Sequence, residues 1–79
     1  MKLSNKTKKF IKDEAQRMEI SKKKAKEIEL KALKTINSLP PGSEEEDEKM
    51  YKIIIFVDYV HEYVKNISKL VKAKRNGTI

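Results

Sequence analysis

Residues 50–71 read MYKIIIFVDYVHEYVKNISKLV, and the spacing of their apolar side chains predicts the architecture of the chain. Apolar residues recur at alternating intervals of three and four, which is the heptad spacing of a helix that packs lengthwise against another helix. Five β-branched or aromatic residues in a row, 53–57, would also suit a buried strand. The heptad continues through them, so we expect a helix. The heptad residues are Met50, Ile53, Val57, Val60, Val64, Ile67 and Val71.

The ends of this helix are also marked in the sequence. Ser43 is followed three positions later by Glu46, which is a capping-box pattern. Residues 44–48 are all acidic, and negative charge is favoured in the first turns of a helix, so we prefer this explanation to an acidic interaction motif. Basic residues and then Gly77 follow at the other end. The sequence therefore predicts a helix over 44–75, about 46 Å long at ~1.5 Å per residue.

The apolar face of this helix is unusually wide. With Ile54, Phe56, Tyr63 and Leu70 included it covers about 200°, roughly twice the width expected of a surface helix. Two short helices can cover one side of the long helix but not all of this face, so we expect a homodimer through it. The alternative is a monomer in which the short helices wrap both flanks. The candidate dimer or partner interface comprises Val57, Val60, Tyr63, Val64 and Ile67.

Two other residues of the long helix, Ile55 and Tyr59, lie outside the apolar face. They are left to contact a partner or another helix of the bundle.

Two shorter amphipathic helices precede the long one. The first is expected over about 4–18, where Thr7, Ile11 and Met18 share one stripe, and the second over 21–38, with Ser21 as its N-cap. Pro40-Pro41-Gly42 then ends the second helix, because proline fixes φ and lacks an amide donor. The predicted fold is all-α: three helices, with a short helical hairpin packed on a long C-terminal helix.

The chain has 79 residues, which allows one helical domain. We divide it into a basic helical pair (1–39), the Pro-Pro-Gly break (40–43), the long helix (44–75) and a frayed tail (76–79). A domain of this size is marginally stable unless disulfides, metals or oligomerisation add to it. The chain has no Cys and one His, so we expect no disulfide, no metal and no cofactor. Oligomerisation therefore remains as a possible source of additional stability.

Charge is sorted along the chain. Residues 1–34 hold twelve Lys or Arg against five acids, a net +7, whereas residues 35–50 hold five acids against one Lys, a net −4. A run of exposed lysines often serves only solubility, but these are poorly balanced by acids and favour a polyanionic partner. Lys contacts phosphate as a point charge and reads bases poorly, so we expect phosphate contacts with little sequence reading. The candidate nucleic-acid-binding residues are Lys8, Lys9, Lys12, Lys22, Lys23, Lys24 and Lys26.

Residues 14–28 weakly resemble a helix-turn-helix unit, in which the start of the second helix enters the major groove of DNA. The small and apolar residues expected to be buried are Ala15, Met18, Ile20, Ala25 and Ile28. Two positions depart from the pattern. Glu19 stands where Gly is usual, and Glu14 stands where an apolar residue is common. A plain helical hairpin is the simpler interpretation.

The primary functional hypothesis is a small basic nucleic-acid-binding protein, with DNA as the expected partner. The alternative is a helical protein–protein interaction module, an adaptor or inhibitor that uses the wide apolar face of the long helix. We do not expect membrane binding, because the apolar residues of the first helix are needed for the core. No catalytic constellation is visible, so we predict no enzyme, and we expect His61 to be partly buried or at an interface. The absence of Cys and of a readable export signal favours a cytoplasmic protein.

Overall fold

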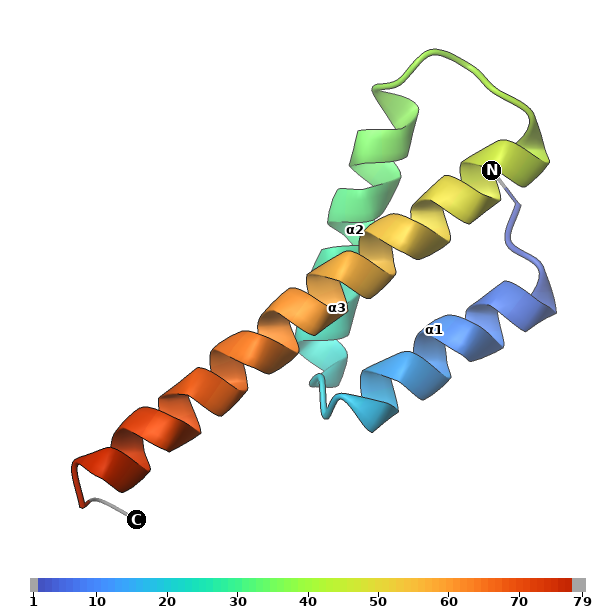
Figure 1. Cartoon of the computed structure of the whole chain (residues 1–79). Helices are drawn as coiled ribbons and strands as arrows, with labels where there is room; N and C mark the ends of the chain where they lie inside the picture. The colour runs from blue at the N-terminus through green and yellow to red at the C-terminus, as the bar shows by residue number, and fades with distance from the viewer. Residues whose placement is uncertain (1, 78–79) are drawn as a thin grey trace.

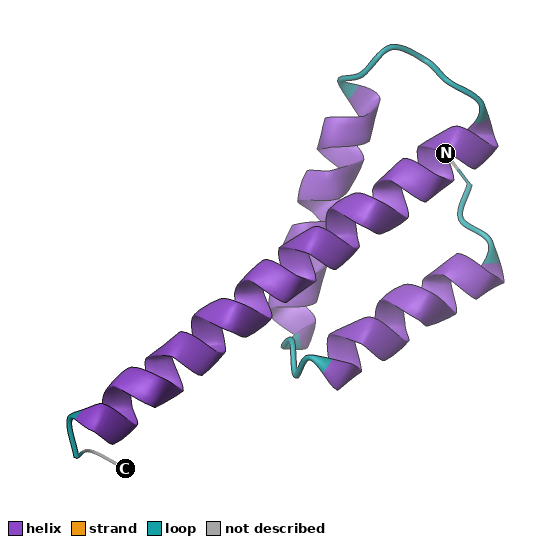
Figure 2. Ribbon diagram, in the orientation of Figure 1, coloured by secondary structure: helices purple, strands orange, loops and turns teal. Residues whose placement is uncertain are grey.

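The computed structural model describes residues 2–77 and confirms an all-α fold with a long C-terminal helix packed against two shorter ones (Figures 1 and 2). The helices are α1 (Asn5–Arg17), α2 (Lys22–Asn37) and α3 (Glu44–Arg75). The predicted bounds of α3 agree with the structure, and those of α1 and α2 differ by one residue at each end. Of the predicted frayed tail, 76 and 77 close α3, and 78–79 lie outside the described residues.

Each helix begins after a serine. Ser4, Ser21 and Ser43 have extended backbones, and each hydroxyl accepts a hydrogen bond from the N–H three residues later. This bond satisfies one of the free amides at a helix start. At the other end of α3, Asn76 is the C-cap and Gly77 has φ +70°, a conformation that glycine adopts without a Cβ clash.

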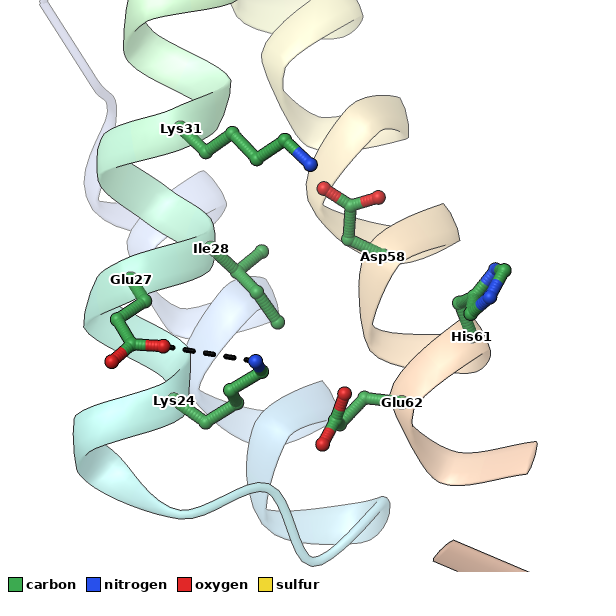
Figure 3. Close-up of a pocket in the computed structure, with 7 residues that line it drawn as sticks. All are labelled: Lys24, Glu27, Ile28, Lys31, Asp58, His61 and Glu62. Atoms are coloured by element: carbon green, nitrogen blue, oxygen red, sulfur yellow. Dashed lines mark ion pairs between the residues drawn. The ribbon is translucent and has the colours of Figure 1, made fainter. Parts of the chain in front are cut away.

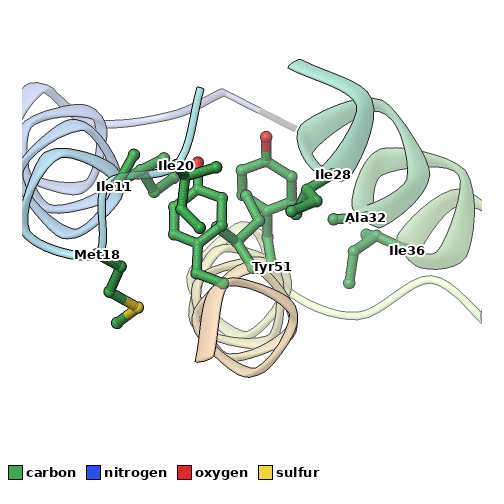
Figure 4. Close-up of a cluster of buried hydrophobic side chains, with 10 residues drawn as sticks. Ile11, Met18, Ile20, Ile28, Ala32, Ile36 and Tyr51 are labelled. Atoms are coloured by element: carbon green, nitrogen blue, oxygen red, sulfur yellow. The ribbon is translucent and has the colours of Figure 1, made fainter. Parts of the chain in front are cut away.

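The core lies between α3 and the two shorter helices (Figure 4). From α3 it receives Tyr51, Ile55 and Tyr59, which are spaced by four residues and are each at most 2% exposed. Side chains spaced by four share one face of a helix. The buried side chains that meet them from α1, the α1–α2 joint and α2 are Ile11, Ala15, Met18, Ile20, Ile28, Ala32 and Ile36.

Most heptad residues of α3 face away from this core, and the short helices cover only one edge of the wide apolar face, as expected: Ile54 and Val60 are half-buried against the core. Ile53, Val57 and Val64 are 63%, 55% and 55% exposed. At ~100° per residue, Ile55 lies nearly opposite Val57. The reason is size: α1 and α2 present mainly Ile and Ala, and the large rings of Tyr51 and Tyr59 fill the space between them.

The second half of α3 projects beyond the bundle. No residue after Tyr59 in the described chain is buried, and the C-terminal part of α3, 63–75, extends away from α1 and α2 (Figure 1). The molecule is accordingly elongated, with dimensions of 51 × 24 × 17 Å.

One flank of α1 packs against α3 through aromatic contacts. The rings of Phe10 and Phe56 lie 6.3 Å apart, centre to centre, in a tilted arrangement. Lys52 Nζ sits 4.7 Å from the centre of the Phe10 ring on the same flank. A cation over an aromatic face is attracted by the ring quadrupole, so Lys52 adds to this contact. Together these side chains fix the edge at which α1 meets α3.

Candidate nucleic-acid interface

The joint between α1 and α2 is a tight turn with a left-handed residue. Glu19 has φ +56°, and the N–H of Ile20 donates a 2.8 Å hydrogen bond to the carbonyl of Ala15. Met18 and Ile20, on either side of Glu19, are both buried. Burial of both neighbours holds Glu19 in a conformation that is unfavourable for a residue with a Cβ.

The small and apolar residues at this joint are buried mainly against α3, as is expected of a plain helical hairpin as well as of a helix-turn-helix unit. Ala15, Met18, Ile20 and Ile28 are buried, and Ala25 is half-buried. The two departures noted in the sequence are accommodated. Glu19 adopts the left-handed conformation that Gly usually supplies at this position.

The second departure, Glu14, is half-buried and is held by a charged partner on the same helix. Its Oε2 accepts a 3.0 Å hydrogen bond from Nε of Arg17 and a second bond from the same guanidinium. A carboxylate is thereby tolerated at a position where an apolar residue is common.

A groove runs between α1 and α2, and it brings the two lysine clusters together. Its volume is about 300 Å³. Lys8 and Lys12 line it from α1, and Lys22 and Lys26 from α2. Each pair is spaced by four residues, so its two members share one face of their helix. The apolar lining includes Leu3, Ile11, Ala15, Ile20 and Ala25. We call Lys8, Lys12, Lys22 and Lys26 the groove lysines.

The other three predicted lysines are outside this groove. Lys9 and Lys23 are exposed, and neither lines it. Lys24 lies on the opposite flank of α2, where its Nζ is 3.7 Å from Oε2 of Glu27. The structure therefore gathers four of the seven predicted lysines at one place, and Lys24 is set apart by its acidic neighbour.

A second hollow, of about 230 Å³, lies between α2 and α3 (Figure 3). Lys31 extends toward Asp58 there, and His61 and Glu62 line the α3 side. His61 is exposed in the single chain and not partly buried, and the alternative expectation, that it lies at an interface, stays a prediction. Among the described residues, no three His, Cys, Asp or Glu side chains are placed to hold a metal ion. Because acids and lysines alternate around it, this hollow is a poorer site for a polyanion than the groove.

Tyr59 lies at the inner side of the groove, and sequence reasoning did not place it there. It is 1% exposed, and its hydroxyl has no hydrogen-bond partner among the described residues. Burial, with smaller contributions from Glu29 and Tyr51, raises the pKa of Tyr59 to about 12. The only signal in the sequence was the four-residue spacing of Tyr51, Ile55 and Tyr59, which the stronger heptad obscured.

The predicted α3 interface residues are mostly at the surface. Val57, Tyr63, Val64 and Ile67 are exposed, and Val60 is half-buried. A shallow hollow lined by Val57, Val60 and Val64 runs along this part of α3. No described residue of α1 or α2 lines it.

No family model matches the chain, and neither a curated protein nor a solved structure shows significant similarity to it. Within residues 2–77, no helix has the length and apolar content needed to cross a bilayer. Geometry and charge are therefore the basis for a functional proposal.

Proposed function

We propose that this protein binds nucleic acid, with duplex DNA as the preferred form, through the groove lysines and the neighbouring Lys23. The observation that carries the proposal is the convergence of Lys8 and Lys12 with Lys22 and Lys26 on one groove. Glu29 is the one acid that lines this groove among the described residues. Four cations against one anion leave a local excess of positive charge, which phosphates would neutralise with release of counterions.

The exposed lysines at the start of α2 support a duplex over a single strand, by analogy with helix-turn-helix units. In such units the first residues of the second helix enter the major groove. In α2 these positions carry Lys22, Lys23 and Lys26, all exposed. Single-strand binding commonly uses exposed aromatic rings on which bases stack. No described residue that lines the groove is an exposed aromatic, since Tyr59 is buried.

The chemistry of the cations favours backbone contact over base reading. Arg makes the commonest specific contact to guanine, but Arg17, the one arginine in α1 and α2, is paired with Glu14. The groove itself offers ammonium groups, which bind phosphate as point charges. We therefore expect affinity that varies little with DNA sequence.

A fluorescence-anisotropy titration of a labelled duplex at several salt concentrations tests the proposal. Five phosphate contacts give a slope of log K against log salt near −4.5, at ~0.9 per contact. Replacing Lys22 and Lys26 by Gln removes two contacts and makes the slope shallower by about 1.8.

The matched control replaces Lys31 and Lys34, on other faces of the same helix, by Gln. It makes the same change in net charge but leaves the groove intact, so we expect the slope to remain nearly unchanged. Absence of binding at low salt contradicts the proposal. Equal losses for the two double variants contradict the groove as the binding site.

A further inference from the structure

The outward face of α3 carries an apolar stripe that the described chain leaves largely uncovered; Phe56, at its edge, packs against Phe10 of α1. We call it the α3 stripe; its exposed members are Met50, Ile53, Phe56, Val57, Tyr63, Val64, Ile67, Leu70 and Val71, each 37–63% exposed. It runs about 32 Å along the helix at ~1.5 Å per residue. Monomeric proteins rarely expose contiguous apolar patches of more than a few hundred Å², so a surface of this extent indicates a binding partner.

The projecting half of α3 leads to the same conclusion. Residues 63–75 form 13 residues of helix with no buried side chain in the described structure. An isolated helix of that length is marginal in water, because most helical stability in proteins comes from packing of one face. A partner that packs along the stripe would supply this missing support.

We propose that the partner is a second copy of this chain, paired through the α3 stripe in antiparallel orientation. The heptad spacing of the stripe is the pattern that packs against a similar helix, and a two-fold pair needs only one self-complementary surface. The core face of α3 points the other way, with Tyr51, Ile55 and Tyr59 buried against α1 and α2. The two short helices of each copy therefore lie mainly on the other side of α3, with Phe10 of α1 reaching the edge of the pairing surface at Phe56.

The charge of α3 determines the orientation. Its first turns carry only acids, over 44–48, and its last eleven residues carry Lys65, Lys69, Lys72, Lys74 and Arg75. A parallel pair would place the two acidic ends together and the two basic ends together. An antiparallel pair centred near Val60 places the acidic end of each copy beside the basic end of the other. Opposite charges that flank a helix pair favour this arrangement.

The available area is close to that of a stable complex. Nine side chains that are about half exposed offer on the order of 700 Å² of apolar surface, near the ~800 Å² per partner of a standard interface. The projecting half of each α3 would pack along the bundled half of the other. The proposal does not depend on nucleic-acid binding, and its tests use the protein alone.

Sedimentation over a concentration series gives the first test. We expect the wild-type chain to form a dimer and Val64→Asp to raise the dimer dissociation constant at least tenfold, because two carboxylates enter the apolar seam. Leu30→Asp is the matched control: Leu30 is 61% exposed on α2, away from the stripe, so we expect dimerisation to persist. Circular dichroism verifies that each variant is helical. A helical wild-type chain that stays monomeric overturns the proposal and assigns the stripe to a different protein.

Disulfide trapping tests the orientation, and the chain has no Cys of its own that could form competing cross-links. An antiparallel pair brings Met50 of one copy beside Val71 of the other, so Met50→Cys mixed with Val71→Cys should cross-link under oxidising conditions. Val71→Cys alone should not, because the two residues at position 71 would lie about 32 Å apart by helical rise, whereas disulfides need Cα atoms within ~7 Å. Cross-linking of Val71→Cys with itself overturns the antiparallel assignment, and cross-linking in neither sample overturns the pairing.

Discussion

Ser4 and Glu48 join the start of α1 to the first turns of α3 across 44 positions of sequence. The backbone N–H and the hydroxyl of Ser4 both donate to Glu48 Oε1, at 3.0 and 2.7 Å. Hydrogen bonds from the hydroxyls of Thr7 and Ser4, followed by the Ser4 N–H, lower the pKa of Glu48 to about 2. The serine that caps α1 thus also attaches α1 to α3.

This attachment predicts a specific dependence of stability on pH. Because folding lowers the pKa of Glu48, its contribution is fully present above about pH 4.5, its ordinary value, and is lost as the pH falls toward 2. We expect Glu48→Gln to unfold at a lower temperature than wild type at neutral pH, and the difference to shrink as the pH falls through that window. Thermal unfolding followed by circular dichroism at a series of pH values measures it.

Glu45→Gln provides the control for that experiment. Glu45 lies three residues earlier in α3 and makes only an exposed ion pair with Lys49, at 3.7 Å, among the described contacts. Exposed pairs contribute little, so its pH profile should follow wild type. A Glu45→Gln profile that matches Glu48→Gln would show that the effect comes from general acidic charge.

The packing face of α3 can be tested with two isoleucines two positions apart. Ile55 is 1% exposed and Ile53 is 63% exposed. We expect Ile55→Ala to lower the free energy of unfolding by about 2–5 kcal/mol, because it leaves a cavity in the core. Ile53→Ala should cost less than about 0.5 kcal/mol. Urea unfolding in the Val64→Asp background, which separates folding from association, compares them; equal costs would contradict the assigned face.

Replacement of Glu19 tests the strain at the joint. A φ of +56° costs a residue with a Cβ roughly 1–2 kcal/mol. Glycine avoids this cost, but it loses more backbone entropy on folding, so only part of the difference appears as added stability. We expect Glu19→Gly to raise the free energy of unfolding by about 0.5–1 kcal/mol. The same replacement at Glu27, inside α2, should lower it by about 1 kcal/mol. Urea unfolding measures both, and destabilisation at both positions would be evidence against strain at Glu19.

Removal of the buried Tyr59 hydroxyl should raise the free energy of unfolding. A buried donor without a partner costs about 1–3 kcal/mol, so Tyr59→Phe should stabilise the fold by about 1–2 kcal/mol. Because folding raises the pKa of Tyr59 from 10.0 to about 12, wild type should also lose stability as the pH rises across that range. Tyr59→Phe should lack this loss. Tyr63→Phe is the control at an exposed tyrosine, and its stability should resemble that of wild type. If Tyr59→Phe is instead less stable than wild type, the Tyr59 hydroxyl has a partner.

The helices and their starts were predictable because their signals are local. Ser21 and Ser43 cap the helices that they were expected to begin, and Pro40-Pro41-Gly42 separates α2 from α3. The inward face of α3 was not predictable from periodicity. Two apolar patterns overlap on that helix, and the longer one, the heptad, is the one exposed. Which pattern α1 and α2 cover depends on the sizes of residues far away in sequence.

The candidate site was predicted in part. Helical spacing placed Lys8 with Lys12 and Lys22 with Lys26, but the meeting of the two pairs depends on the left-handed turn at Glu19. Nothing in the residue type at position 19 indicates that turn, because Glu rarely adopts it. Separation of Lys24 from the others follows from its position on the opposite flank of α2.

The unsupported half of α3 has a consequence for how the protein responds to its own abundance. If residues 63–75 are stabilised only by a second copy, their helicity follows mass action and rises with the concentration of the chain. In a dilute sample this half should exchange its amide hydrogens quickly, while the half beside Tyr51 and Ile55 remains protected. One continuous helix would then consist of a permanent segment and a segment whose order reports how much of the protein is present.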